Sequence, residues 1–295
     1  MQGFSLKKRL LPFTRPRRCG VCPLQLLILL FVALLLITWL LREPLFTGWR
    51  RQRVRRQPFP PAWRQTLRER VPYFRLMPAD LQLQLKKHIQ VFLAEKPFIG
   101  CAGLVVSDEM RVMIAAQACL LILNRRGDCF PNLRQVLVYP GAFVVDRPHV
   151  DGSGVQQDQR RVLAGESWQQ GQVILSWQDA VEGANAPDDG RNVVIHEFAH
   201  PLDQDNGRAN GAPWLGGQRR RERWAQVLGQ EFTHLQQRVR DRQPSLFSDY
   251  GATDPAEFFA VASEVFFEQP KRLATEHAAL YGELSGFYRV NPLSW

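Results

Sequence analysis

The segment HEFAH, residues 196–200, constrains the fold of this chain more than any other stretch. On an α-helix, residues four apart lie on one face, so His196 and His200 can direct both imidazoles at one metal ion. Glu197 then stands beside the ion, placed to take a proton from a metal-bound water. The alternative is a helix that carries two histidines for structural reasons alone. The segment therefore predicts a helix and favours a zinc site on it.

A zinc site of this kind needs a third protein ligand. The metzincin pattern would continue with Gly and His, but this chain has Asp203 and Asn206 there, which excludes that class. Two downstream glutamates remain. Glu257 follows a strong helix start, where a glutamate is often only a capping partner, whereas Glu264 lies in an apolar run, where a carboxylate needs a partner. Spacing alone leaves open which of the two is the ligand and which supports a ligand.

An apolar stretch of 18 residues, 24–41, precedes the motif. As a helix it would be about 27 Å long, enough to cross a thin hydrocarbon core. A cleaved signal peptide is the alternative, but the stretch is too long and no small-residue cleavage site follows it. We therefore expect an uncleaved transmembrane helix. Six basic residues on each side leave its orientation undecided.

The charge is concentrated at the N-terminus. Residues 1–56 hold 12 Lys and Arg and one acidic residue, whereas the other 239 residues hold 26 basic and 27 acidic ones. The main domain is thus nearly neutral, and we expect no nucleic-acid partner. The expected order is a basic arm (1–23), a transmembrane helix (24–41), a basic linker containing prolines (42–62) and a catalytic domain (63–295).

Periodicity gives the elements of the main domain. A helix start at Pro78 and Asp80 precedes an apolar stripe that runs to residue 95, and Ser107 is the expected N-cap of a central helix. Between residues 135 and 177 the pattern changes to β-branched runs bounded by Gly and Pro. The segment QVILSW, 172–177, is the expected edge strand for an extended substrate. This order predicts an α+β, mostly helical domain with a small β-sheet.

Two motifs together resemble the MtfA-like zinc-dependent peptidases. The chain has HEFAHPLD at 196–203 and DYGATDPAEFFAVASE at 249–264, and a weaker resemblance extends from about residue 59 to the C-terminus. The resemblance implies a zincin-like catalytic domain with Glu257 as the third zinc ligand and Tyr250 as a catalytic residue. Gly251 departs from the family pattern, which often has Ala there. The membrane anchor is a second departure, since the best-known member is cytosolic.

These observations predict a membrane-anchored zinc metallopeptidase that cleaves a peptide or protein substrate. Zn²⁺ is the expected cofactor, with Glu197 as general base and Tyr250 as hydrogen-bond donor to the oxyanion. Asp203 and Glu264 are expected to accept the second N–H of the ligand histidines. We expect a single-pass protein of the inner (cytoplasmic) membrane. The charges leave the side of its catalytic domain open, and the resemblance to a family whose best-known member is cytosolic favours the cytoplasmic side. The alternative is a binding module that sequesters a transcriptional repressor, a partner that the resemblance implies.

Overall fold

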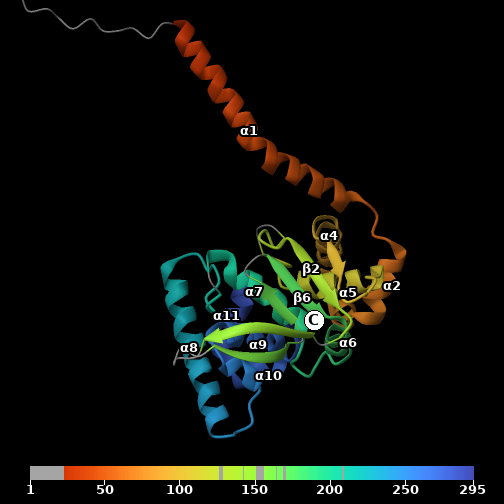
Figure 1. The fold of residues 1–295 in the computed structure, drawn as a ribbon, viewed down its shortest axis with the longest axis vertical. Helices are drawn as coiled ribbons and strands as arrows, with labels where there is room; N and C mark the ends of the chain where they lie inside the picture. The colour runs from red at the N-terminus through yellow and green to blue at the C-terminus, as the bar shows by residue number, and fades with distance from the viewer. Residues whose placement is uncertain are drawn as a thin grey trace, which may run out of the picture. The chain divides into compact units, whose positions relative to one another are not determined.

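A computed structural model of the chain describes residues 23–125, 129–141, 143–150, 156–163, 165–168, 171–207 and 209–295 (Figure 1). It divides into two compact units, Met1–Gln52 and Arg53–Trp295. The α-helices are α1 (Pro23–Arg56), α2 (Pro61–Arg70), α3 (Pro72–Leu76), α4 (Ala79–Glu95), α5 (Asp108–Leu120), α6 (Trp177–Asn185), α7 (Val193–Asp203), α8 (Gln218–Arg240), α9 (Pro255–Glu268), α10 (Pro270–Glu276) and α11 (Ala278–Tyr288). The strands are β1 (Phe98–Gly100), β2 (Gln135–Tyr139), β3 (Phe143–Val150), β4 (Gln156–Leu163), β5 (Gly165–Trp168) and β6 (Gln172–Ser176). Short 3₁₀ turns are η1 (Gln204–Asn206), η2 (Asp249–Ala252) and η3 (Pro292–Ser294).

Helix α1 covers the apolar stretch at 24–41 and continues through residues 42–56, which we expected to be linker. Arg, which favours helix, is frequent there, and the proline cluster that ends the helix begins only at Pro58. A transmembrane helix was expected over 24–41. Within the described part of the chain, however, we find no helix that is both long and apolar enough to cross a membrane.

The second unit contains a small sheet with the strand order β1-β2-β6-β5. Strands β1, β2 and β6 are parallel, and β5 pairs with β6 in the antiparallel direction. The expectation that 172–177 forms an edge strand is therefore wrong, because β6 lies between β2 and β5. The edge strands of this sheet are β1 and β5, and β5, the one beside β6, has only four residues and carries no alternating apolar pattern in the sequence. Strands β3 and β4 form a separate antiparallel pair.

The core is built around helices α5 and α9, whose side chains are buried along almost their whole length. Helix α5 begins at the predicted N-cap, where Ser107 Oγ accepts the Met110 N–H at 3.2 Å, and α4 begins after Pro78 as predicted. Helix α7 packs against both α5 and α9 and lies beside strands β5 and β6. The unit is thus mostly helical with a small sheet, as expected for an α+β domain, and its HEFAH helix is held from several sides.

Candidate metal centre

Helix α7 places the HEFAH segment in the interior. Asn192 caps it: its Oδ1 accepts the Ile195 N–H at 3.0 Å. Ile195 and Phe198 are fully buried, and the Phe198 ring lies 5.7 Å from Phe92 and 5.1 Å from Phe130, measured between centroids. This packing fixes the rotation of α7 about its axis, so the opposite face, with both histidines, is turned toward α9.

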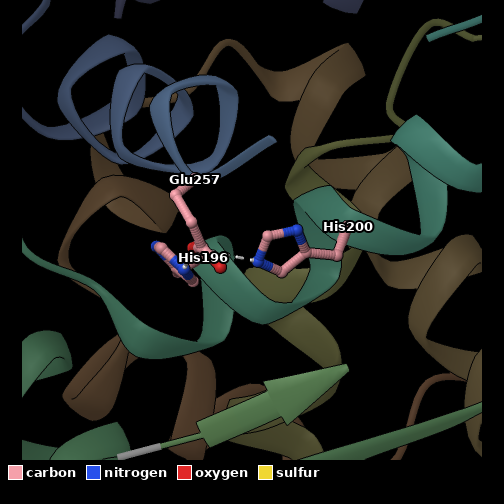
Figure 2. Close-up of side chains that lie close together, drawn as sticks. All are labelled: His196, His200 and Glu257. Carbon is pink, nitrogen blue, oxygen red and sulfur yellow. Dashed lines mark hydrogen bonds and ion pairs between the residues drawn. The ribbon is translucent and has the colours of Figure 1, made fainter. Parts of the chain in front are cut away.

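Helix α9 brings Glu257 to the same place. Asp254 Oδ1 accepts the backbone N–H groups of Ala256 and Glu257, at 2.8 and 3.1 Å, so the helix begins where the Asp-Pro pair predicts. The capping explanation for Glu257 does not account for its side chain, which extends toward the two histidines of α7 (Figure 2).

The ligand atoms of His196, His200 and Glu257 all lie within 4.8 Å of one another. Glu257 Oε2 is 3.0 Å from His196 Nε2 and 3.5 Å from His200 Nε2. Four ligands at 2.0–2.1 Å from a tetrahedral zinc ion lie roughly 3.3 Å apart. Two imidazole nitrogens and one carboxylate oxygen at these separations fit three corners of such a site, and the fourth corner is left for water or substrate.

Glu264, the other candidate ligand, contacts His196 from behind. Its Oε1 lies 2.8 Å from Nδ1, the ring nitrogen that does not face Glu257. Such a contact favours a proton on Nδ1 and leaves Nε2 available for a metal. Burial lowers the pKa of His196, but hydrogen bonds with Glu257 and Glu264 outweigh it and raise the pKa well above its usual value. Burial raises the pKa of Glu257, and its hydrogen bonds to both histidines lower it by more.

Asp203 has a different environment from the one expected. It is fully buried, and its Oδ2 accepts the Gly211 N–H at 2.7 Å. Among the described residues, no hydrogen bond joins Asp203 to His200, because Asp203 lies at the end of α7 and its side chain reaches the loop that follows. Burial raises the pKa of Asp203, and backbone hydrogen bonds from that loop oppose the increase. Asp203 thus holds the loop of residues 209–217 against the end of α7.

The same loop approaches α9 closely at Gly211. A Cβ atom at this position would lie 2.4 Å from the Pro255 carbonyl oxygen, and the residue has a φ of +73°. Only glycine fits this conformation and this space. The Gly211 carbonyl oxygen also accepts the Trp224 Nε1–H at 2.8 Å. Gly211 therefore joins the loop to the first turn of α9, two residues before Glu257.

The two predicted catalytic side chains lie close to the histidines. Glu197 is buried on α7, next to His196 in the chain. Tyr250 lies in η2, its side chain is 40% exposed, and its ring centroid is 5.8 Å from that of His196. The site thus combines three possible metal ligands, a buried carboxylate and a solvent-accessible phenol, which are the groups that metal-assisted hydrolysis requires.

Sequence reasoning missed two residues of this region, Asn192 and Gly211. Asn192 had a detectable signal, since Asn directly before an apolar helical run is an N-cap signature. Gly211 had none, because its close approach to Pro255 depends on the folded positions of two distant segments.

Comparison with known proteins gives a consistent result. A family model described as glucose-regulated metallo-peptidase M90 matches residues 46–289. An uncharacterized protein of Synechocystis is 38% identical over 267 residues, which cover 90% of this chain and 97% of the relative. Proteins named Mlc titration factor A are also similar. That of Klebsiella pneumoniae is 34% identical over 79% of this chain and 87% of its own length, and that of Escherichia fergusonii 34% identical over 83% and 91%.

Proposed function

Since the chain belongs to the glucose-regulated metallo-peptidase M90 family, we propose that it hydrolyses peptide bonds with a zinc ion held by His196, His200 and Glu257. The observation that carries the proposal is the convergence of these three side chains from two helices, with their ligand atoms within 4.8 Å of one another. Two imidazoles and one carboxylate are a donor set that zinc hydrolases use.

The proposed mechanism divides the work among a few side chains. Zinc in such a site lowers the pKa of water and polarises the scissile carbonyl. Glu197 takes the proton from the attacking water and passes it to the leaving amine. The Tyr250 O–H donates a hydrogen bond to the carbonyl oxygen as negative charge develops on it. Glu264 holds the His196 ring through Nδ1.

We propose that an extended substrate binds at one edge of the sheet. Strand β5 is the outer strand beside β6, and α7 packs against it. Its outward N–H and C=O groups can pair with a peptide, which then runs past the histidines of α7. We assign substrate alignment to β5 and no longer to residues 172–177.

A second candidate function is regulatory binding. Several relatives are named Mlc titration factor A, a name that refers to another protein, Mlc. A surface that binds a transcriptional regulator could act without hydrolysis, and the metal centre would then have a structural role.

The variant Glu197→Gln distinguishes the two functions. It keeps the size of the side chain but removes the proton acceptor, so we expect about one zinc per chain, an unchanged fold and peptide cleavage reduced by about 10²–10⁴. Tyr250→Phe should also keep zinc and lose about 10² or more in activity. The measurements are metal content by elemental analysis and hydrolysis of a fluorogenic peptide library. Cleavage at the wild-type rate by Glu197→Gln would refute the mechanism, and a wild type without cleavage but with regulator binding would favour the second function.

We also propose that the protein is attached to the inner membrane through residues 24–41, with the catalytic domain on the cytoplasmic side. This proposal rests on the apolar stretch in the sequence and, for the side of the membrane, on the family resemblance.

A further inference from the structure

A buried polar network surrounds Asn192, the residue that precedes α7. Its side-chain Nδ2 lies 2.7 Å from Gln117 Oε1, 2.9 Å from Glu268 Oε1 and 3.1 Å from the Tyr73 hydroxyl. These partners come from α5, α9 and α3, so one amide joins three helices to the start of α7. All four side chains are buried, with at most 6% exposed.

The side chain of Asn192 makes more hydrogen bonds than a helix cap requires. The cap requires only Oδ1 of Asn192, which accepts the Ile195 N–H. The amide nitrogen has two hydrogens and three acceptors within 3.1 Å, so one of these bonds is shared. These bonds hold the buried Asn192 amide in one position, because turning it away would leave its buried partners without a donor.

A chain of contacts leads from this amide to the metal centre. The backbone N–H of Asn192 donates to Glu264 Oε2 at 2.5 Å, and the other oxygen of Glu264 lies 2.8 Å from His196 Nδ1. The anchored side chain fixes the direction of the N–H, the N–H fixes the Glu264 carboxylate, and the carboxylate fixes the imidazole ring. The ring then presents Nε2 toward Glu257.

Glu268 anchors the Asn192 amide as a hydrogen-bond acceptor and not as one member of a charge pair. Burial, with the nearby charges of Asp189 and Glu264, raises the pKa of Glu268 to about 9, although the hydrogen bond from Asn192 opposes the increase. Glu268 is therefore neutral near pH 7. It anchors the Asn192 amide without placing a second negative charge beside Glu264, one helical turn away on α9.

We propose that Asn192, anchored by Glu268, is a positioning residue for the metal centre and holds His196 in its ligand orientation through Glu264. This rests on the proposed function, because it assumes that His196 binds zinc. Residues outside the ligand set typically contribute about 10- to 100-fold to metal affinity when they orient a ligand. Asn192 acts one contact further out than Glu264, so we expect a loss at the lower end, about 10-fold.

The test compares two caps in the full chain. Asn192→Ser keeps an oxygen that can cap α7 but removes the amide. Ser107→Ala removes the cap of α5, where Ser107 Oγ accepts the Met110 N–H and, among the described residues, is bonded to no side chain of the metal centre. Zinc affinity is measured by competition with a chromogenic chelator, and ligand geometry by the visible absorption of the Co²⁺-substituted protein. We expect about 10-fold weaker zinc binding and a changed Co²⁺ spectrum for Asn192→Ser, and wild-type values for Ser107→Ala.

A second variant covers the case in which Asn192→Ser does not fold. Glu268→Ala removes the anchor and leaves the cap of α7 intact, and it should also weaken zinc binding. If the folded variants bind zinc as tightly as the wild type with the same Co²⁺ spectrum, Asn192 is only a cap and the inference is overturned. A wild-type chain that does not bind zinc would instead refute the proposed function, so the two failures can be told apart.

Discussion

Substituting Gly211 by alanine tests how firmly the loop of residues 209–217 is joined to helix α9. The residue has a φ of +73°, and an added Cβ would lie 2.4 Å from the Pro255 carbonyl oxygen and 2.9 Å from its carbonyl carbon. Gly216 in the same loop has a φ of +82° but no atom within 4 Å of an added Cβ. Gly216→Ala is therefore a matched control that carries the conformational penalty without the overlap.

The expected magnitudes follow from this difference. A left-handed conformation disfavours alanine by about 1–2 kcal/mol relative to glycine, and this applies to both variants. Overpacking adds about 1–3 kcal/mol for Gly211→Ala alone, because a 2.4 Å contact must open by about 1 Å. For a domain of this size, about 1 kcal/mol corresponds to a shift of roughly 2–4 °C in the melting temperature. Gly211→Ala should thus melt several degrees below Gly216→Ala.

The substitution should also affect the metal centre. Pro255 can yield only by moving the first turn of α9, and Glu257 lies two residues further on. We expect weaker zinc binding for Gly211→Ala and unchanged binding for Gly216→Ala, measured by chelator competition beside urea denaturation of the purified protein. Equal stabilities and equal zinc affinities for the two variants would refute the idea that this contact positions Glu257.

Two further predictions concern titration and location. Glu268 keeps its proton in the folded state up to a pKa of about 9 but loses it near 4.5 when unfolded, so its contribution to stability falls as pH rises between these values, by at most about 1.4 kcal/mol per pH unit. Glu268→Gln lacks this loss, so in urea denaturation its free energy of unfolding should rise relative to that of the wild type between pH 5.5 and pH 8. Parallel pH profiles of the two proteins would show that the Glu268 carboxyl is ionised in the folded state. If the proposed anchor is present, alkaline extraction should leave the full chain in the membrane and should release a chain without residues 1–52. Release of both chains would exclude a spanning helix.

Local signals account for the parts of the fold that the sequence predicted. Ser107 caps α5 and Asp254 with Pro255 begins α9, and each acts on backbone groups within three residues. The HEFAH helix follows in the same way from the spacing of its apolar residues and of its two histidines. Such elements are predictable because the interactions that form them are local.

The remaining features depend on contacts between distant segments. Strand β5 was not expected, since its four residues become a strand only by pairing with β6, and this pairing moves β6 into the interior. Asp203 was assigned to a histidine but binds the Gly211 backbone, because the path of the following loop is not encoded in the helix pattern. The family resemblance was needed to choose Glu257 over Glu264 as the expected ligand, since both residues lie on one face of α9. Only tertiary packing places them on different sides of the His196 ring, Glu257 at Nε2 and Glu264 at Nδ1.

The packing of α7 against α9 also lowers the entropic cost of bringing the metal ligands together. His196 and Glu257 are 61 residues apart, so the folded domain has already closed a long loop before any ion arrives. For an unfolded chain, closing a loop of this length costs about 4 kcal/mol, which corresponds to about a thousandfold in affinity. Without α9, only the two histidines of a single helix turn would remain as ligands. A bound ion therefore selects the docked arrangement, and any movement that separates α9 from α7 would release the ion and reopen the loop.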